Sequence, residues 1–148
     1  MAYLIREIAN DHEKEMVYQL RKEVFVEEQG IPAYLDKDGR DEESRHVIAL
    51  NEQEEIMAGG RLSPHPKENI GILSRIAVSK NHRRKGLGKH VIKVLESLAK
   101  EYNYRAVQLK PHVHLESFYQ SIGYKTLSKD EGPAGKYPLL LMEKELGV

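Results

Sequence analysis

The chain has 148 residues, enough for a single domain, residues 1–148, that buries roughly two-thirds of the surface of the unfolded chain. Lysine plus arginine and aspartate plus glutamate each number 23, and this zero net charge argues against nucleic acid as the partner, because nucleic-acid-binding proteins carry a basic excess. The absence of cysteine excludes disulfides, thiolate metal sites and a cysteine-linked intermediate.

The apolar runs of the chain predict no membrane segment. The first residues, MAYLIREIAN, are charged by position 6, and their apolar run is too short for a signal peptide. The longest apolar run, Tyr137–Met142, is too short to cross a bilayer. We expect a cytoplasmic protein with no membrane partner.

The N-terminal part predicts a strand over residues 2–8 and then a helix capped by Asn10 or Asp11. Apolar side chains recur in this helix at helical spacing, at Met16, Val17, Leu20 and Val24. The helix should fade near residues 25–29, because Gly30 and Pro32 stop it.

Residues 31–43 predict a loop or a broken short helix rich in aspartate. We favour solvated loop positions for its acidic residues, with one wall of a site for a cationic substrate as the alternative. The D-x-D-G start at Asp36 lacks the later ligand spacing of a calcium loop, so we expect no calcium.

A hairpin follows, with strands at residues 47–50 and 56–62 and a turn between them. Gly59 and Gly60 inside its second strand indicate a bulge or a close backbone approach. Residues 63–69, with two prolines, predict the next turn.

Residues 70–102 predict a strand, a basic turn and a helix in succession. In the strand, residues 70–78, alternate apolar side chains share one face: Ile70, Ile72, Ile76 and Val78. Residues 79–85 contain no apolar side chain and four basic ones. From Gly86 the spacing becomes helical for about four turns, through Leu87, Val91, Val94, Leu95, Leu98 and Tyr102.

The start of this helix is a candidate anion site, because the first N–H groups of a helix lack intrahelical acceptors. Gly86 and Gly88 leave that backbone accessible. The basic side chains around it are Arg83, Arg84, Lys85 and Lys89. This spacing fits a pyrophosphate cradle, and it fits a tight turn with a solvated basic face equally well. A Walker A loop is excluded because His90 follows Lys89, and a dinucleotide fingerprint because Val91 replaces its third glycine.

The C-terminal part predicts a strand over residues 105–110, ended by Pro111, and a short helix that Gly123 closes. The apolar residues of this helix are Leu115, Phe118, Tyr119 and Ile122. Residues 124–127 and 137–143 predict the last strands. The elements together predict an α/β sandwich in which helices cover a sheet.

Two histidines and a tyrosine are the candidate chemical groups of this part. His112 and His114 lie on one side of an extended segment, but no third ligand is nearby, so we expect no metal. We expect His114 to cap the short helix or to fill a hydrogen-bonded position. Tyr119 lies on the apolar stripe, where core packing is the ordinary role. Its phenol, with a pKa of about 10, is also able to protonate a leaving thiolate of pKa about 8.5.

Two of these stretches together resemble a known family. IAVSKNHRRKGLGKHVIKVLESLAK resembles the acyl-CoA motif of the GNAT superfamily of N-acetyltransferases, a strand followed by R-x-x-G-x-G and a helix. HVHLESFYQSIGY, residues 112–124, resembles the second family motif, N-x(6)-Y-x(3)-G-[FY]. VFVEEQGIPAYLDKDGRDEESRHV is similar to the ElaA-like subgroup, so the resemblance covers nearly the whole chain. It implies the GNAT fold, a mixed central sheet flanked by helices on both faces.

The resemblance implies direct acetyl transfer from acetyl-CoA to an amine of a small molecule or peptide. By the family pattern, Ile76, Ala77 and Val78 line the pantetheine arm, and an N–H of that strand polarises the thioester carbonyl. The residues that hold the pyrophosphate are Arg83, Arg84, Lys85, Gly86, Leu87, Gly88 and Lys89. His112 is expected to contact the cofactor, and Tyr119 to contact it and to act as general acid for the departing thiolate.

Two positions depart from the family pattern. His112 replaces the usual asparagine, and Ser74 stands near the position of a glutamate that deprotonates the amine in many members. Ser74 cannot act as that base unaided. The substitutes within the chain are Glu27, Glu28, His46 and His114, unless the amine is already neutral. Of these we favour Glu28, because the segment after the first helix often borders the acceptor site in this superfamily.

The missing glutamate also motivates an alternative function, a catalytically inactive CoA-binding regulatory module. The sequence leaves the acceptor and the oligomeric state open, and a homodimer is the common assembly for soluble proteins.

Overall fold

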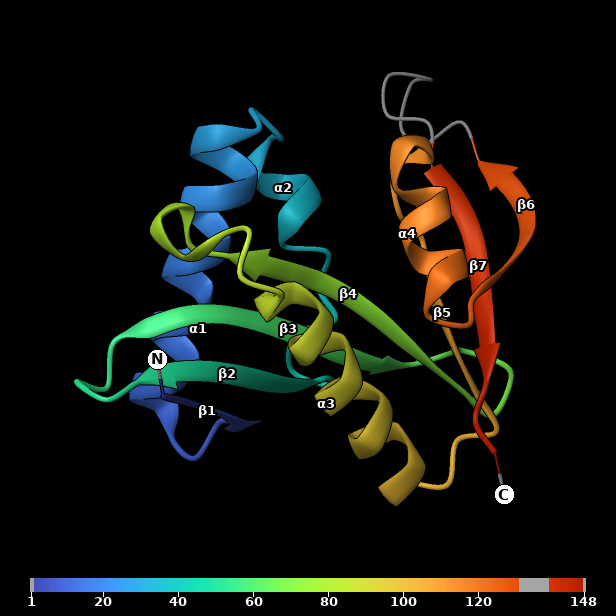
Figure 1. The fold of residues 1–148 in the computed structure, drawn as a ribbon, viewed down its shortest axis with the longest axis horizontal. Coiled ribbons are helices and arrows are strands. Elements are labelled where there is room, and N and C mark those ends of the chain that lie inside the picture. Colours follow the sequence, from blue (N-terminus) through green and yellow to red (C-terminus); the bar gives the residue numbers. More distant parts are fainter. Residues whose placement is uncertain (1, 131–138, 148) are drawn as a thin grey trace.

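The computed structural model describes residues 2–130 and 139–147. In these residues seven strands form one mixed sheet in the order β1-β2-β3-β4-β5-β7-β6 (Figure 1). The strands are β1 (Tyr3–Glu7), β2 (Arg45–Asn51), β3 (Ile56–Pro64), β4 (Ile70–Val78), β5 (Ala106–Leu109), β6 (Lys125–Asp130) and β7 (Leu139–Glu145). Within the described sheet, β4 and β5 are the one parallel pair, and the other neighbours are antiparallel.

Helices cover both faces of the sheet (Figure 1). The α-helices are α1 (Asp11–Arg21), α2 (Ala33–Asp36), α3 (Leu87–Glu101) and α4 (Glu116–Ser121). Short 3₁₀ turns at Lys80–His82 and Val113–Leu115 precede α3 and α4. α4 lies on the α3 side, because its Tyr119 packs in the same apolar cluster as Leu95 of α3. The predicted mixed α/β sheet with helices on both faces is confirmed.

Two adjacent glycines of β3 allow this two-sided packing. The space beside Gly59 is taken by Val17 of α1, 3.6 Å from where a β-carbon would stand. A β-carbon on Gly60 would stand 2.8 Å from Leu95 and 2.9 Å from Val91, both on α3. The register between β3 and β4 also shifts at this point, but the extra residue lies on β4. Of the two predicted alternatives, a bulge or a close approach, the close approach is therefore the one confirmed.

α1 begins where the sequence predicts, because the side chain of Asn10 accepts a hydrogen bond of 2.9 Å from the N–H of Glu13. The helix continues beyond Arg21 as a π-helix over Lys22–Glu28. Gly30, with a φ of +71°, lies directly beyond its end, in agreement with the predicted stop.

β4 contains a bulge that the alternation of apolar residues does not reveal. Arg75 and Ile76 both lie opposite Gly60 of β3, and Arg75 has a left-handed backbone with a φ of +55°. The bulge reverses the faces of the residues around it, so Leu73, rather than Ile72, packs with Ile76 in the cluster under α3. The prediction of one shared face for Ile70, Ile72, Ile76 and Val78 is wrong for this reason.

α3 has the predicted position and length, 15 residues, and its apolar stripe is buried through Leu98. Tyr102 lies beyond the end of the helix and is 42% exposed. Its ring lies against the guanidinium of Arg45, 3.8 Å from the ring centroid, rather than against the core. The helix therefore ends one residue before Tyr102, the last position of the predicted helical pattern.

The C-terminal elements agree with the sequence where they are described. Gly123, with a φ of +102°, follows α4, and β5 and β6 lie close to their predicted positions. Positions 137 and 138 of the predicted last strand lie outside the described residues, and β7 begins at Leu139. In the described part of the chain, no helix combines the length and the hydropathy needed to cross a bilayer.

Candidate active site

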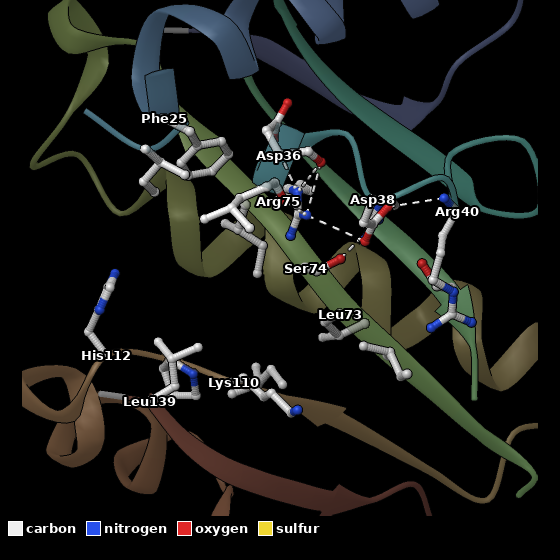
Figure 2. A pocket seen from close by; sticks show the side chains of 18 of the residues that line it. Phe25, Asp36, Asp38, Arg40, Leu73, Ser74, Arg75, Lys110, His112 and Leu139 are labelled. Carbon is white, nitrogen blue, oxygen red and sulfur yellow. Dashed lines mark hydrogen bonds and ion pairs between the residues drawn. The ribbon is translucent and has the colours of Figure 1, made fainter. Parts of the chain in front are cut away.

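The candidate site lies where β4 and β5 separate. The two strands pair through three residues only, Ile70 to Ile72 on β4, and then diverge. A cavity of about 460 Å³ occupies the opening between them (Figure 2). Its walls come from residues 72–76 of β4, residues 109–112 at the end of β5 and after it, the α4 region and the segment from Phe25 to Arg40. Arg61 and Ser63 of β3 and Leu139 of β7 complete the lining.

Tyr119 of α4 lines this cavity and is 8% exposed. Its ring packs edge-on against Phe118 and Tyr124, with centroids 5.0 and 5.6 Å away. Burial raises the pKa of the Tyr119 phenol above its ordinary value of 10, so the group stays protonated at neutral pH. The hydroxyl makes no hydrogen bond to any described residue, which leaves its proton available to a ligand in the cavity.

A buried polar network fixes the ring behind Tyr119. The hydroxyl of Tyr124 donates to Glu96 of α3 at 2.7 Å, and Lys144 of β7 donates to the other oxygen of that carboxylate at 3.0 Å. Burial and the carboxylate raise the pKa of Tyr124 strongly, so this phenol is a fixed donor. These hydrogen bonds therefore fix the position of the Tyr124 ring, against which the Tyr119 ring packs.

His112 also lines the cavity, and its ring stacks on that of His114 with centroids 5.9 Å apart. The two imidazoles thus lie side by side, as the sequence predicts. No side chain caps the N-terminus of α4, so the predicted capping role of His114 is wrong. In residues 2–130 and 139–147, no group of three histidine, aspartate or glutamate side chains is placed to hold a metal ion.

The glycine turn before α3 has the backbone of an anion site. Arg84 and Gly86 have left-handed φ values of +65° and +74°, and Gly86 is the N-cap without a side-chain hydrogen bond to the helix. A β-carbon on Gly88 would meet only Val78, at 3.7 Å, so the packing of the chain itself does not require glycine there. The first N–H groups of α3 are accordingly open to an acceptor from outside.

Arg83 and Glu28, both predicted site residues, bind each other. The guanidinium of Arg83 donates to the two carboxylate oxygens at 2.6 and 2.7 Å, and also to the carbonyl of Val78 at 3.0 Å. The hydrogen bonds from Arg83 lower the pKa of Glu28. Glu28 does not line the cavity, so its position does not support the role of general base.

The other candidates for the general base do not line the cavity either. Glu27, His46 and His114 are absent from its walls. His46 is 3% exposed and lies against the carbonyl of Asp41 at 3.2 Å, and burial lowers the pKa of its imidazole. Ser74 does line the cavity, where its hydroxyl accepts a hydrogen bond of 3.0 Å from Arg61.

Of the residues predicted to bind the cofactor, Ile76, His112 and Tyr119 line the cavity. Val78 is half-buried at the end of β4 under α3, and Ala77 is 2% exposed and packs toward α1. Residues 83–89 lie beyond that end of the strand, outside the cavity walls.

The preferred interpretation of the acidic segment, solvated loop residues, is wrong. Asp36 is 7% exposed, and Asp36, Asp38 and Asp41 each bind at least two arginines. Contacts with Arg61, above all its hydrogen bonds, hold the pKa of Asp38 well below its ordinary value. Asp36 and Asp38 line the cavity, together with Arg61 and Arg75. In the sequence, these ion pairs are indicated by Arg61 and Arg75, each of which lies within a largely apolar predicted strand.

Comparison with known proteins places this architecture in a family. The chain matches the model of the Acetyltransferase (GNAT) family over residues 12–124. It is 32% identical to the uncharacterized N-acetyltransferase YjcF of Bacillus subtilis over 136 residues, which are 92% of this chain and 95% of that protein. It is also 32% identical to protein ElaA of Escherichia coli over 109 residues, 72% and 71% of the two chains.

Solved structures agree on the fold. A putative N-acetyltransferase from Lactobacillus plantarum has a TM-score of 0.89 at 23% identity, covering 99% of this chain and 100% of that one. Escherichia coli ElaA has a TM-score of 0.80 at 26% identity, with 97% and 99% covered. An aminoglycoside 6'-N-acetyltransferase complexed with coenzyme A shares the fold at 17% identity, with a TM-score of 0.78 over 96% of each chain.

The chain belongs to the GNAT acetyltransferase family, and it is therefore an acyltransferase. Within that family it is ElaA-like, as its matches to ElaA in sequence and in structure show.

Proposed function

We propose that this protein transfers the acetyl group of acetyl-CoA to an amine of a small molecule or peptide. The observation that carries the proposal is the opening between β4 and β5, with a buried, protonated Tyr119 in its wall. The open start of α3, beyond the end of β4, supplies a second contact for the same ligand.

The binding residues follow from this arrangement. The N–H groups at Leu87–Lys89 and the basic side chains of Arg84, Lys85 and Lys89 hold the pyrophosphate. The backbone of Ile76–Val78, which pairs with no described strand on the β5 side, pairs with the pantetheine arm, which runs toward the cavity. Arg83 joins the phosphate site only if it leaves Glu28, because both carboxylate oxygens bind it.

Two groups of the chain act on the reacting atoms. A backbone N–H of β4 near the bulge donates to the thioester oxygen as negative charge develops there. The amine forms its bond to the carbonyl carbon, the carbon–sulfur bond then breaks, and Tyr119 gives its proton to the departing thiolate. The amine loses one proton in the same sequence, and Tyr119 regains one from solvent. Of the described side chains in the cavity wall, His112 is the imidazole and thus the candidate acceptor of the amine proton.

The acidic side chains of the cavity do not select a cationic acceptor. Asp36 binds Arg21 and Arg75, and Asp38 binds Arg61 and Arg75, so their charges are already compensated. We therefore expect the acceptor to be recognised by shape and hydrogen bonding rather than by ion pairs with these carboxylates.

The test combines binding with turnover. Isothermal titration with acetyl-CoA should show binding to the wild type and a sharp loss in Arg84→Glu, because charge is reversed at the phosphate site. A thiol-release screen over amines and peptides should identify an acceptor, and Tyr119→Phe should then lower kcat with little change in CoA affinity. Unchanged turnover in Tyr119→Phe would remove this residue from catalysis.

The same screen distinguishes acetyl transfer from the alternative function. Binding of acetyl-CoA without thiol release for every acceptor would indicate a CoA-binding regulatory module and would contradict acetyl transfer. Lys125→Glu, an equal charge reversal on β6, is the matched control for Arg84→Glu and should leave binding unchanged.

A further inference from the structure

An ionic cluster lies along one wall of the cavity. It consists of Arg21, Arg61, Arg75, Asp36, Asp38 and Asp41. The three arginines come from three different elements, α1, β3 and β4, whereas the three aspartates come from one short segment at the end of α2 and after it. The formal charges of the cluster cancel, so it does not form a charged patch. Its ion pairs join α1 and the sheet to this segment.

Arg75 has an exceptional place in the ionic cluster, because its own backbone forms the bulge of β4. Its guanidinium donates to the carbonyl of Leu35 at 3.0 Å and to the carbonyl of Asp36 at 2.9 and 3.1 Å. It also lies 3.1 Å from the carboxylate of Asp36 and 3.4 Å from that of Asp38 (Figure 2). One side chain therefore holds the last turn of α2 through both main chain and carboxylate.

These contacts explain an unfavourable backbone conformation. A φ of +55° is costly for any residue with a β-carbon, and Arg75 is not a glycine. The surrounding structure must over-determine such a conformation for it to persist, and residues of this kind concentrate at functional sites. Here the guanidinium contacts with Leu35 and Asp36 supply that constraint.

The two parts that Arg75 joins both line the cavity. Ser74 and Ile76, its neighbours in the bulge, line the cavity from the strand side. Leu35 and Asp36 line it from the helix side. A shift of the guanidinium would thus move the strand that faces the thioester and the segment that borders the acceptor at the same time.

We infer that Arg75 is a positioning residue for acetyl transfer, holding the β4 bulge and the residue 33–38 segment in one fixed relation. This inference rests on the proposed function, in which the N–H groups around the bulge meet the thioester. Arg21 and Arg61 bind the same aspartates from α1 and β3, and Arg61 also donates to the hydroxyl of Ser74. Arg75 differs from both because it is itself the left-handed residue of the bulge. A lysine cannot replace Arg75, because the contacts need a planar fork that reaches two carbonyls and a carboxylate together.

The main test is Arg75→Gly. Glycine adopts the left-handed φ freely, so this variant removes the guanidinium without straining the backbone. We expect kcat/KM for the amine to fall by about tenfold to a hundredfold, the scale of a roughly 1 Å misplacement. The Kd for CoA should change much less than kcat/KM, because residues 83–89, which hold the pyrophosphate in the proposed function, lie outside the ionic cluster. Arg75→Lys, which keeps the charge but loses the fork, should show most of the same loss.

The matched control is Arg45→Gly on β2, where an exposed arginine binds Glu7 and Tyr102 away from the cavity. All variants are assayed below their melting temperatures, so lost stability does not count as lost activity. A second readout is amide hydrogen exchange over residues 31–40, which should become faster in Arg75→Gly and stay unchanged in α3. Neither change is expected in Arg45→Gly.

The outcomes separate this inference from the proposed function. Wild-type kcat/KM and wild-type exchange in Arg75→Gly would overturn the positioning role, and so would an equal loss of CoA binding and turnover, which indicates general damage. If the wild type binds acetyl-CoA but acetylates nothing, the proposed function fails, and the exchange experiment alone still decides whether Arg75 fixes the two walls.

Discussion

Replacing Gly88 by alanine should raise the stability of the free protein. Gly88 lies in the first turn of α3, and the added β-carbon would meet only Val78, at an ordinary contact distance of 3.7 Å. Alanine is favoured over glycine in helices by up to about 1 kcal/mol. For a chain of this size each kcal/mol moves the melting temperature by roughly 2–4 °C, so we expect an increase of that order or somewhat less.

The same substitution should weaken CoA binding. The methyl group would stand among the N–H groups that the proposed function gives to the pyrophosphate, and it would keep a phosphate from close approach. We expect the Kd for CoA to rise by at least about tenfold, equivalent to 1.4 kcal/mol. Stability and affinity should therefore change in opposite directions in Gly88→Ala, as measured by thermal melting and isothermal titration.

Gly60→Ala is the matched control for this experiment. Its β-carbon would stand within 3 Å of Val91 and Leu95 in the core, so it should cost about 1–3 kcal/mol of unfolding free energy. Because its β-carbon would meet Val91 and Leu95 rather than the N–H groups at Leu87–Lys89, the Kd for CoA should stay near that of the wild type. Gly88→Ala with an unchanged Kd would refute the phosphate site at α3, and a lowered melting temperature would refute the steric argument.

Two further predictions concern ion pairs. Glu28→Gln should release Arg83 and strengthen CoA binding in titrations, most at low salt. Glu27→Gln makes the same charge change on an exposed neighbour and should strengthen binding less. Equal effects of the two variants would contradict competition between Glu28 and CoA for Arg83. Hydrogen bonds from Arg6 lower the pKa of Glu13 from 4.5 to about 2, so the stability that this pair contributes is present above pH 4.5 and is lost as the pH falls through 2. Urea titrations should therefore show a smaller drop over that range in Glu13→Gln, and parallel curves for the two proteins would exclude the pair as the cause.

Periodic patterns predicted most of the fold, because they report which side chains face the core. The stripe of α3 and the cap at Asn10 are local properties of the chain, and both are found as predicted. The family motifs likewise placed Tyr119, Ile76 and His112 near one site, and the three residues line one cavity.

Features that depend on distant residues were not predicted. The aspartates of residues 36–41 look like loop residues until Arg21, Arg61 and Arg75 are brought to them from 15 to 39 positions away. The bulge in β4 was not predicted for the same reason. Its left-handed residue is Arg75, which a contact with α2 holds in place, and no glycine marks the position in the sequence. The pairing of Glu28 with Arg83 was likewise not predicted, because Arg83 lies 55 residues further along the chain.

Because β4 and β5 separate after three paired residues, this sheet has an unpaired strand edge between two of its inner strands. Beyond Ile72, and within the described residues, β4 has a neighbouring strand on the β3 side alone. Unpaired strand edges invite foreign strands and aggregation. A ligand with extended amide groups that enters the opening would cover this edge. In the proposed function this ligand is acetyl-CoA, whose binding would then also pair the open edge of β4.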